Sequence, residues 1–262
     1  MRRSPEETIK SFLVGSPPGE FQQAATALEG LIGDPAPVNA VQAACFKEWS
    51  HRNCHTVSIN GNPTIISDIS QVAENTYVNP YDMHLFRYDF ERRRFKPLAD
   101  EHPSSPARNE LQKLFMEYAK NAYMSNVGVG VYDGKCGTLQ IILRSSSISL
   151  KNFRTGNITA RYQLCPDGKL TGNVLIMQHF FENGNVMCSQ TAQLDTQVTP
   201  GDLKGCVQKV KEFEDAWLAA YLETFNRLSS DGITKLRRKM SVTGTKINWE
   251  AEFRGLTGMQ GV

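Results

Sequence analysis

Residues 170–193 are LTGNVLIMQHFFENGNVMCSQTAQ, and this stretch decides the fold. A strand-like run from Leu170 to Phe181 ends in Glu182-Asn183-Gly184-Asn185, and a second run returns from Val186 to Gln193. The Asn-Gly pair tolerates the positive φ angles that tight turns between antiparallel strands need. The stretch therefore predicts a β-hairpin.

Three further strand-like runs precede this hairpin, at 127–132, 138–144 and 158–165. The first two are joined through Asp133-Gly134-Lys135-Cys136-Gly137, whose glycines permit the positive φ of a tight connection. Consecutive strands with short connections predict an antiparallel meander that includes the hairpin.

Helical patterns flank the meander. An amphipathic helix is expected over about 109–124, and a long helix begins at Gly201. Its apolar stripe comprises Leu203, Val207, Val210, Phe213, Trp217, Tyr221, Phe225 and Leu228, with Lys204, Lys211, Glu214 and Asp215 expected to face elsewhere. A helix of this kind can lie across the sheet.

In the N-terminal part, apolar residues recur first with a helical period and then with a strand-like period of two. Helical patterns at 5–13, 20–32 and 38–49 predict a small antiparallel bundle. Beyond His51 the period becomes two, with a hairpin expected from 55–59 and 64–66, and a strand from Met83 to Phe90 that buries its aromatic face. The run from Leu98 to Arg108 is rich in Pro, Ser and charge, and is expected to be an exposed loop.

This order of elements predicts an α+β fold with an antiparallel sheet. Five segments are expected: an N-terminal helix bundle (1–50), a small β region and loop (51–108), a helix plus antiparallel sheet (109–200), a long helix and basic segment (201–248), and a flexible C-terminal extension (249–262).

Composition indicates a soluble globular chain. It has 262 residues, 40% hydrophobic and 21% charged, with a formal net charge of +2 that gives little long-range attraction to nucleic acid or membrane. No run approaches the roughly 20 apolar residues of a membrane span. Six cysteines without a disulfide spacing are expected to be reduced, which favours the cytosol.

Nothing in the sequence has the pattern of a catalytic or metal site. Cys45, His51, Cys54 and His55 cluster, but no second pair completes a zinc site. His179 has no nucleophile or carboxylate fixed near it by sequence, and neither a dinucleotide loop nor a phosphate loop occurs. We expect no catalytic residue, no metal and no cofactor.

Four motifs stand out along the chain: Pro17-Pro18-Gly19-Glu20-Phe21, Lys151-Asn152-Phe153, the run from His179 to Val186, and the run from Arg237 to Trp249. In this order they resemble motifs of the F-actin capping protein α subunit family. The last resembles the family's Arg-Arg-Gln-Leu-Pro-Val-Thr-Arg-Thr-Lys-Ile-Asp-Trp without gaps. The resemblance spans nearly the whole chain.

The resemblance implies an α/β heterodimer in which two subunits of one fold join their sheets beneath crossed long helices. It implies binding to the barbed, fast-growing end of actin filaments without calcium, which blocks subunit addition and loss, and a place in the cytoplasm with the cytoskeleton. Acidic phosphoinositides and regulators with capping-protein-interaction motifs are possible further partners. Nucleic acid is not expected.

The same resemblance gives a candidate actin-binding site near the C-terminus. Its basic members are Lys235, Arg237, Arg238, Lys239 and Lys246, and its apolar members are Trp249, Phe253 and Leu256. A basic patch favours an acidic partner. Thr234 and Gly244 replace a lysine and an arginine of the family.

A second hypothesis stays open from the residues alone: a basic module that binds acidic phospholipid or nucleic acid without capping filaments. Without the resemblance, the basic cluster is also typical of a solvated helix end, where cations offset the helix dipole. The glycines at 255, 258 and 261 disfavour a stable free helix beyond Trp249.

Overall fold

The computed structural model describes residues 4–123, 127–182 and 185–227, and the chain divides between Ser104 and Ser105 into two compact units. Helices and purely antiparallel sheets make up both units, which confirms the α+β class. In the described residues, no helix is long and apolar enough to cross a membrane.

The first unit opens with three helices, α1 (Pro5–Val14), α2 (Phe21–Ile32) and α3 (Ala36–Arg52), as the periodicity predicted. Ser4 begins α1 with a capping box, because its hydroxyl accepts from the Glu7 amide while the Glu7 carboxylate accepts from the Ser4 amide. The Trp49 indole donates to the Ser16 carbonyl at 2.9 Å. This bond joins α3 to the turn after α1.

A hairpin of β1 (His55–Ile59) and β2 (Asn62–Ile66) follows, as expected. A four-stranded sheet comes next, in the order β3 (Gln71–Ala73), β4 (Thr76–Val78), β5 (His84–Asp89), β6 (Arg94–Glu101). The aromatic face predicted for β5 is confirmed, since Phe86, Tyr88 and the following Phe90 are buried.

Two features of this sheet differ from expectation. Strands β3 and β4 carry only three residues each, too few to show a period. The loop expected over 98–108 is too long: it is confined to 102–105, because β6 runs to Glu101 and the next helix starts at Pro106. The charges and Pro97 of this stretch are tolerated in β6 because it is an edge strand with a mostly exposed surface.

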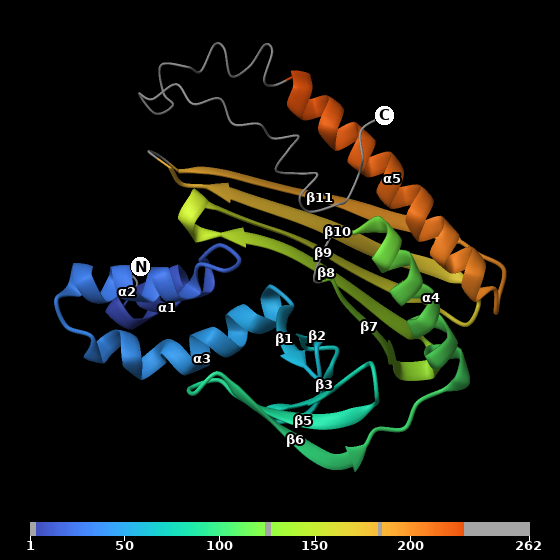
Figure 1. Cartoon of the computed structure of the whole chain (residues 1–262), viewed down its shortest axis with the longest axis horizontal. Helices are drawn as coiled ribbons and strands as arrows, with labels where there is room; N and C mark the ends of the chain where they lie inside the picture. Colours follow the sequence, from blue (N-terminus) through green and yellow to red (C-terminus); the bar gives the residue numbers. More distant parts are fainter. Residues whose placement is uncertain (1–3, 124–126, 183–184, 228–262) are drawn as a thin grey trace. The chain divides into compact units, whose positions relative to one another are not determined.

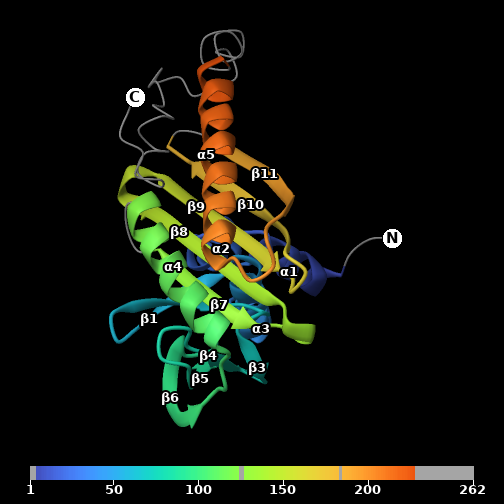
Figure 2. The ribbon, with the colours of Figure 1, turned by 90° about the vertical axis from the view of Figure 1, so that its right-hand side faces the viewer.

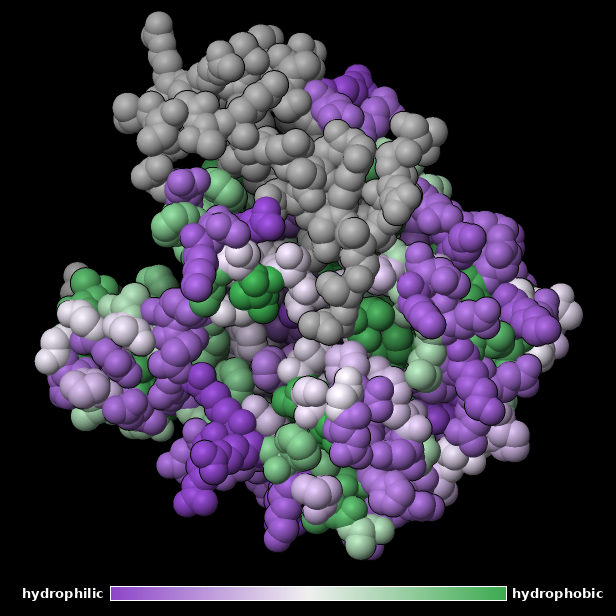
Figure 3. All heavy atoms as spheres, in the orientation of Figure 1, coloured by the Kyte–Doolittle hydropathy of each residue, from purple (hydrophilic) through white to green (hydrophobic). Residues whose placement is uncertain are grey.

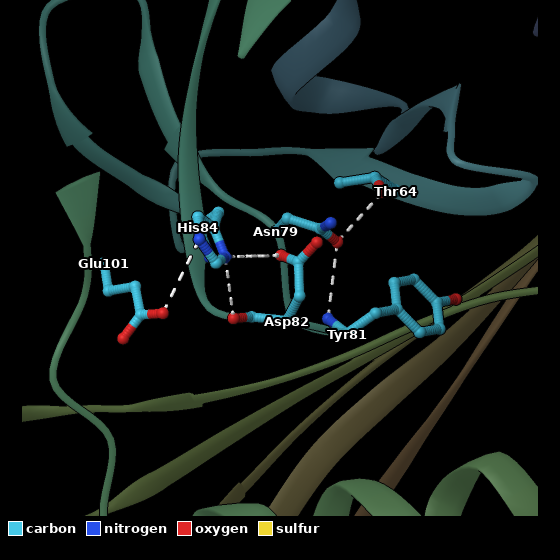
Figure 4. A network of polar contacts seen from close by, with 6 residues as sticks. All are labelled: Thr64, Asn79, Tyr81, Asp82, His84 and Glu101. Carbon is cyan, nitrogen blue, oxygen red and sulfur yellow. Dashed lines mark hydrogen bonds and ion pairs between the residues drawn. The ribbon is translucent and has the colours of Figure 1, made fainter. Parts of the chain in front are cut away.

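Side chains hold the connection between β4 and β5 (Figure 4). The buried Asn79 accepts hydrogen bonds at its Oδ1 from the Thr64 hydroxyl at 3.2 Å and from the Tyr81 amide at 3.3 Å. Farther along, Nε2 of His84 lies 3.5 Å from Oε1 of Glu101. The Asn79 bonds tie β2 to the connection, so the hairpin and the sheet share one polar network.

The second unit contains the predicted meander. Its five strands are β7 (Gly128–Asp133), β8 (Leu139–Ser149), β9 (Arg154–Leu164), β10 (Lys169–Phe180) and β11 (Val186–Gln197), with 3-10 turns at Lys135–Gly137 and Leu150–Asn152. They lie in the order β11-β10-β9-β8-β7. The Asn183-Gly184 turn lies outside the described residues, but Phe180 pairs with Val186 on either side of it.

Two helices cover one face of this sheet, α4 (Pro106–Ala122) and α5 (Leu203–Arg227) (Figures 1 and 2). Both views show α5 running obliquely across the strands, as expected for the long helix. The core beneath them is apolar and includes Leu111, Phe115, Ile141, Leu143, Ile158, Ala160, Val174, Ile176, Val210 and Tyr221. One face of the sheet is therefore closed by this chain's own helices.

Candidate functional site

The eight residues of the candidate actin-binding site lie outside the described residues. The last described element is α5, which ends at Arg227, ahead of Lys235 in the sequence. Helix α5 and the sheet that it covers are the described elements that precede the site in the chain.

The outer edge of β11 is the most distinctive exposed feature of the second unit. Val198 donates its amide to the Gly168 carbonyl at 2.9 Å, just beyond the β10 to β11 ladder. Antiparallel ladders alternate hydrogen-bonded and non-hydrogen-bonded pairs, and this ladder has no register shift. The backbone N–H and C=O groups of the odd residues from Met187 to Gln197 therefore point away from β10.

Nothing in the described parts of the chain covers that edge: no described side chain or loop bonds to the outward backbone groups of β11. The strand has 12 residues, contains neither proline nor lysine, and carries one charge, at Asp195. Long edge strands of this kind readily pair with another strand. The edge is fit to accept a strand from a second chain.

The side chains of β11 alternate between half-buried and exposed along its whole length. On its half-buried side, Cys188 and Ala192 pack against the core under α5. The Tyr221 hydroxyl of α5 donates to Oε1 of Gln178 in β10 at 3.1 Å and lies 3.6 Å from the Cys188 sulfur. The end of α5 is thus fixed beside the open edge.

The edges of the other sheet are protected. Strand β6 carries Arg94, Lys96, Asp100 and Glu101 together with Pro97, and charges and proline at an edge discourage pairing. Hydrophilic side chains also gather where β5 turns into β6 (Figure 3). Strand β3 is short, with a register shift between Gln71 and Ala73. These devices are absent from the bare edge of β11.

The far edge of the five-stranded sheet, β7, is closed by helix α4. The Arg108 Nε donates to the Val131 carbonyl at 2.7 Å. The Gln112 side chain accepts from the Val131 amide at 2.8 Å and donates to the Val129 carbonyl at 3.1 Å. Ser105, the N-cap of α4, donates from its amide and hydroxyl to the Asp133 carboxylate. Of the two edges of this sheet, the described residues leave that of β11 open.

A buried carboxylate positions α5 on the sheet. Glu214 accepts hydrogen bonds of 2.6 Å from the hydroxyls of Tyr118, Tyr123 and Tyr162, which come from α4, the residue that caps it, and β9. Burial raises the pKa of Glu214, and the three hydrogen bonds offset part of the rise. Burial also raises the pKa of Tyr123 and Tyr162, with the Glu214 charge adding to it.

Glu214 was expected on the polar side of the long helix, and that expectation is wrong, because it is only 3% exposed. Lys204, Lys211 and Asp215 do lie on the exposed side. Together with α4, this part of α5 borders a pocket of about 400 Å³ floored by Ile158 and Val174. Glu214, Tyr118 and Tyr123 form part of the pocket wall. The hydrogen bonds between them hold α5 against α4.

In the described residues, the second unit is a two-layer α+β fold whose five-stranded sheet has one edge available for pairing. Comparison with known proteins agrees with the motifs in the sequence. The family described as F-actin capping protein alpha subunit matches residues 9–256. The chain belongs to this family, whose members bind actin and belong to the cytoskeleton.

Similar proteins of fungi carry the name F-actin-capping protein subunit alpha. The one from Yarrowia lipolytica is 24% identical over 95% of this chain and 92% of its own length. The one from Eremothecium gossypii is 28% identical over 93% of this chain and 92% of its own length. Among solved structures, the homodimeric actin capping protein alpha subunit from Plasmodium berghei superposes with a TM-score of 0.64 at 16% identity, covering 84% of this chain and 90% of that one. The last likeness supports the fold.

Sequence reasoning missed the residues that distinguish the two sheet edges. Arg108 and Gln112 lie four residues apart, a spacing that places both on one side of a helix. An arginine and a glutamine at that spacing are usually solvated, so their burial against β7 had no signal of its own.

Proposed function

We propose that this chain is the α subunit of a two-chain capping protein, paired with a β subunit through the edge of β11 and the neighbouring α5. The heterodimer binds the barbed end of actin filaments, without calcium, and blocks subunit addition and loss there. The observation that supports pairing is the 12-residue β11 edge, which lacks every protecting device found at the other described edges of the two larger sheets.

The β subunit suits this edge for a physical reason. A strand added to β11 satisfies the outward N–H and C=O groups of its odd residues and extends the apolar layer of Cys188, Ala192 and Leu194. A partner of the same fold brings an equivalent strand and a long helix. Pairing of this kind joins two five-stranded sheets into one.

The C-terminal segment makes the contact with the filament. Its basic residues Lys235, Arg237, Arg238, Lys239 and Lys246 attract the acidic surface of actin, and Trp249, Phe253 and Leu256 supply apolar contacts. With Thr234 and Gly244 in place of two family cations, Arg238 and its lysine neighbours carry the charge. Acidic phosphoinositides compete for the same cations, and regulators with capping-protein-interaction motifs are further partners.

The test has two stages. The full chain is co-expressed with a β subunit, and the purified complex is added to seeded actin filaments in calcium or in chelator. We expect a 1:1 complex that slows barbed-end elongation equally in both conditions. A chain that stays separate from β contradicts the pairing. A complex that binds acidic vesicles yet leaves elongation unchanged supports the alternative of a basic module without capping activity.

A further inference from the structure

The two edges of the five-stranded sheet differ in whether their outward backbone groups are already hydrogen-bonded. Strand β11 offers its outward backbone groups, whereas β7 has three of its own bonded to α4: the Val129 carbonyl, the Val131 amide and the Val131 carbonyl. A strand that approached β7 would need these same groups. It would have to displace bonds of 2.7 to 3.1 Å that are already formed.

The side chains that make these bonds are unusual for their place. Arg108 and Gln112 are only 3% and 4% exposed, and burying such groups is costly unless they are well bonded. The same helix already packs on the sheet through Leu111, Phe115 and Ala119. Packing therefore does not require a guanidinium and an amide here, and their polar atoms serve the edge of β7.

We propose that Ser105, Arg108 and Gln112 form an edge lock, which denies β7 to strands of other chains and so limits assembly through the sheet to two subunits. The inference rests on the proposed function only in taking β11 as the pairing edge.

Symmetry explains why a second open edge would be harmful. If β7 were free, the β11 edge of one copy could join the β7 edge of the next in a head-to-tail contact that does not close. Contacts of that kind build open chains of subunits. With β7 locked, a strand added at β11 completes the assembly.

The test substitutes Gln112→Leu, which keeps a similar side-chain volume and removes the two hydrogen bonds that Gln112 makes to β7. Glu110→Leu, at an exposed position on the same helix, controls for added apolar surface. Each variant is purified as the complex with β, and its mass is measured by sedimentation across a wide range of concentration. We expect a single mass for the wild type and Glu110→Leu. For Gln112→Leu the mass should rise with concentration to about twice that of the 1:1 complex, as two β7 edges pair.

Amide exchange shows whether the edge has opened. In Gln112→Leu the Val131 amide should exchange roughly tenfold faster than in the wild type, with circular dichroism unchanged. A folded variant with fast exchange at Val131 and one constant mass overturns the edge lock, as does equal association by Glu110→Leu. If Gln112→Leu does not fold, Gln112→Asn keeps the amide but withdraws it from the edge, and the same two outcomes decide.

Failure of the proposed function has a different signature. A chain that does not bind β never yields the wild-type complex. The comparison of Gln112→Leu with wild type is then made on the chain alone, where a difference in mass still reports on β7.

Discussion

The hydroxyl of Tyr162, on strand β9, donates a 2.6 Å hydrogen bond to Oε1 of Glu214, 52 residues later on helix α5. Together with the bonds from Tyr118 and Tyr123 to the other carboxylate oxygen, it fixes one point of α5 against the sheet and α4. This point lies in the middle of α5, the last described element of the chain.

Tyr162→Phe should destabilise the second unit. The substitution keeps the ring in the core and removes one donor to a buried carboxylate, a change that costs about 1.5 to 3 kcal/mol. Chemical denaturation followed by circular dichroism measures the loss. Tyr88→Phe is the matched control, because no hydrogen bond of its hydroxyl is found within the described residues. Equal stability of the two variants would show that the Glu214 bond contributes nothing.

Glu214→Gln should change how stability depends on pH. The pKa of Glu214 is raised by burial, so the folded state holds its proton more tightly than the unfolded state does. Its contribution to stability is therefore complete below the ordinary value of 4.5 and is lost as the pH rises toward the folded pKa. Relative to Glu214→Gln, the wild type should lose free energy of unfolding as the pH rises above 4.5.

The neighbouring Glu212 gives the control for that titration. It is exposed, and hydrogen bonds from Lys209 and Gln208 lower its pKa. Its contribution to stability is present above pH 4.5 and is lost as the pH falls. Relative to Glu212→Gln, the wild type should therefore gain a little free energy of unfolding as the pH rises, which is the opposite trend to that of Glu214. Denaturation curves at several pH values measure both. Parallel trends would contradict the account of Glu214.

Thr191→Pro should block pairing with β while leaving the chain folded. Thr191 is an odd residue of β11, so its amide points away from β10 and is not part of the ladder with Leu175. Proline removes that donor and places its ring at the edge. We expect at least a roughly tenfold weaker complex by titration with labelled β subunit, about 1.4 kcal/mol. Thr191→Ala, which keeps the amide, should bind β normally; tight binding by Thr191→Pro would exclude this edge.

Arg238→Glu should slow capping mainly through the association rate. Reversing one charge in the basic segment weakens electrostatic attraction to the filament end, roughly threefold to tenfold at low salt and less at high salt. Seeded elongation at a series of salt concentrations separates the rates. Thr234→Lys, which adds a cation at a family position, should act in the opposite direction. An association rate that ignores both substitutions would remove this segment from the encounter with actin.

Local patterns in the sequence predicted most of the second unit. Alternation and the Asn183-Gly184 pair were enough for the strands of the meander, because each strand has six residues or more and its period is clear. In the first unit, strands β3 and β4 were not predicted, because three residues are too few to show an alternating pattern. The edge strand β6 was not predicted, because its charged residues and Pro97 are typical of a loop.

The sequence by itself determined the α+β class, the order of the five helices and of the meander strands, and membership of the capping protein α family, because these depend on local periods and ordered motifs. Only the tertiary structure decided that Glu214 is buried, that α4 closes β7 and that β11 is an edge strand left open by the described residues. Each of these depends on groups far apart in the chain, such as Glu214 with Tyr118, or Gln112 with Val131. A glutamate or glutamine looks solvated in sequence, and only its distant partners, brought together by folding, supply the hydrogen bonds that allow it to be buried.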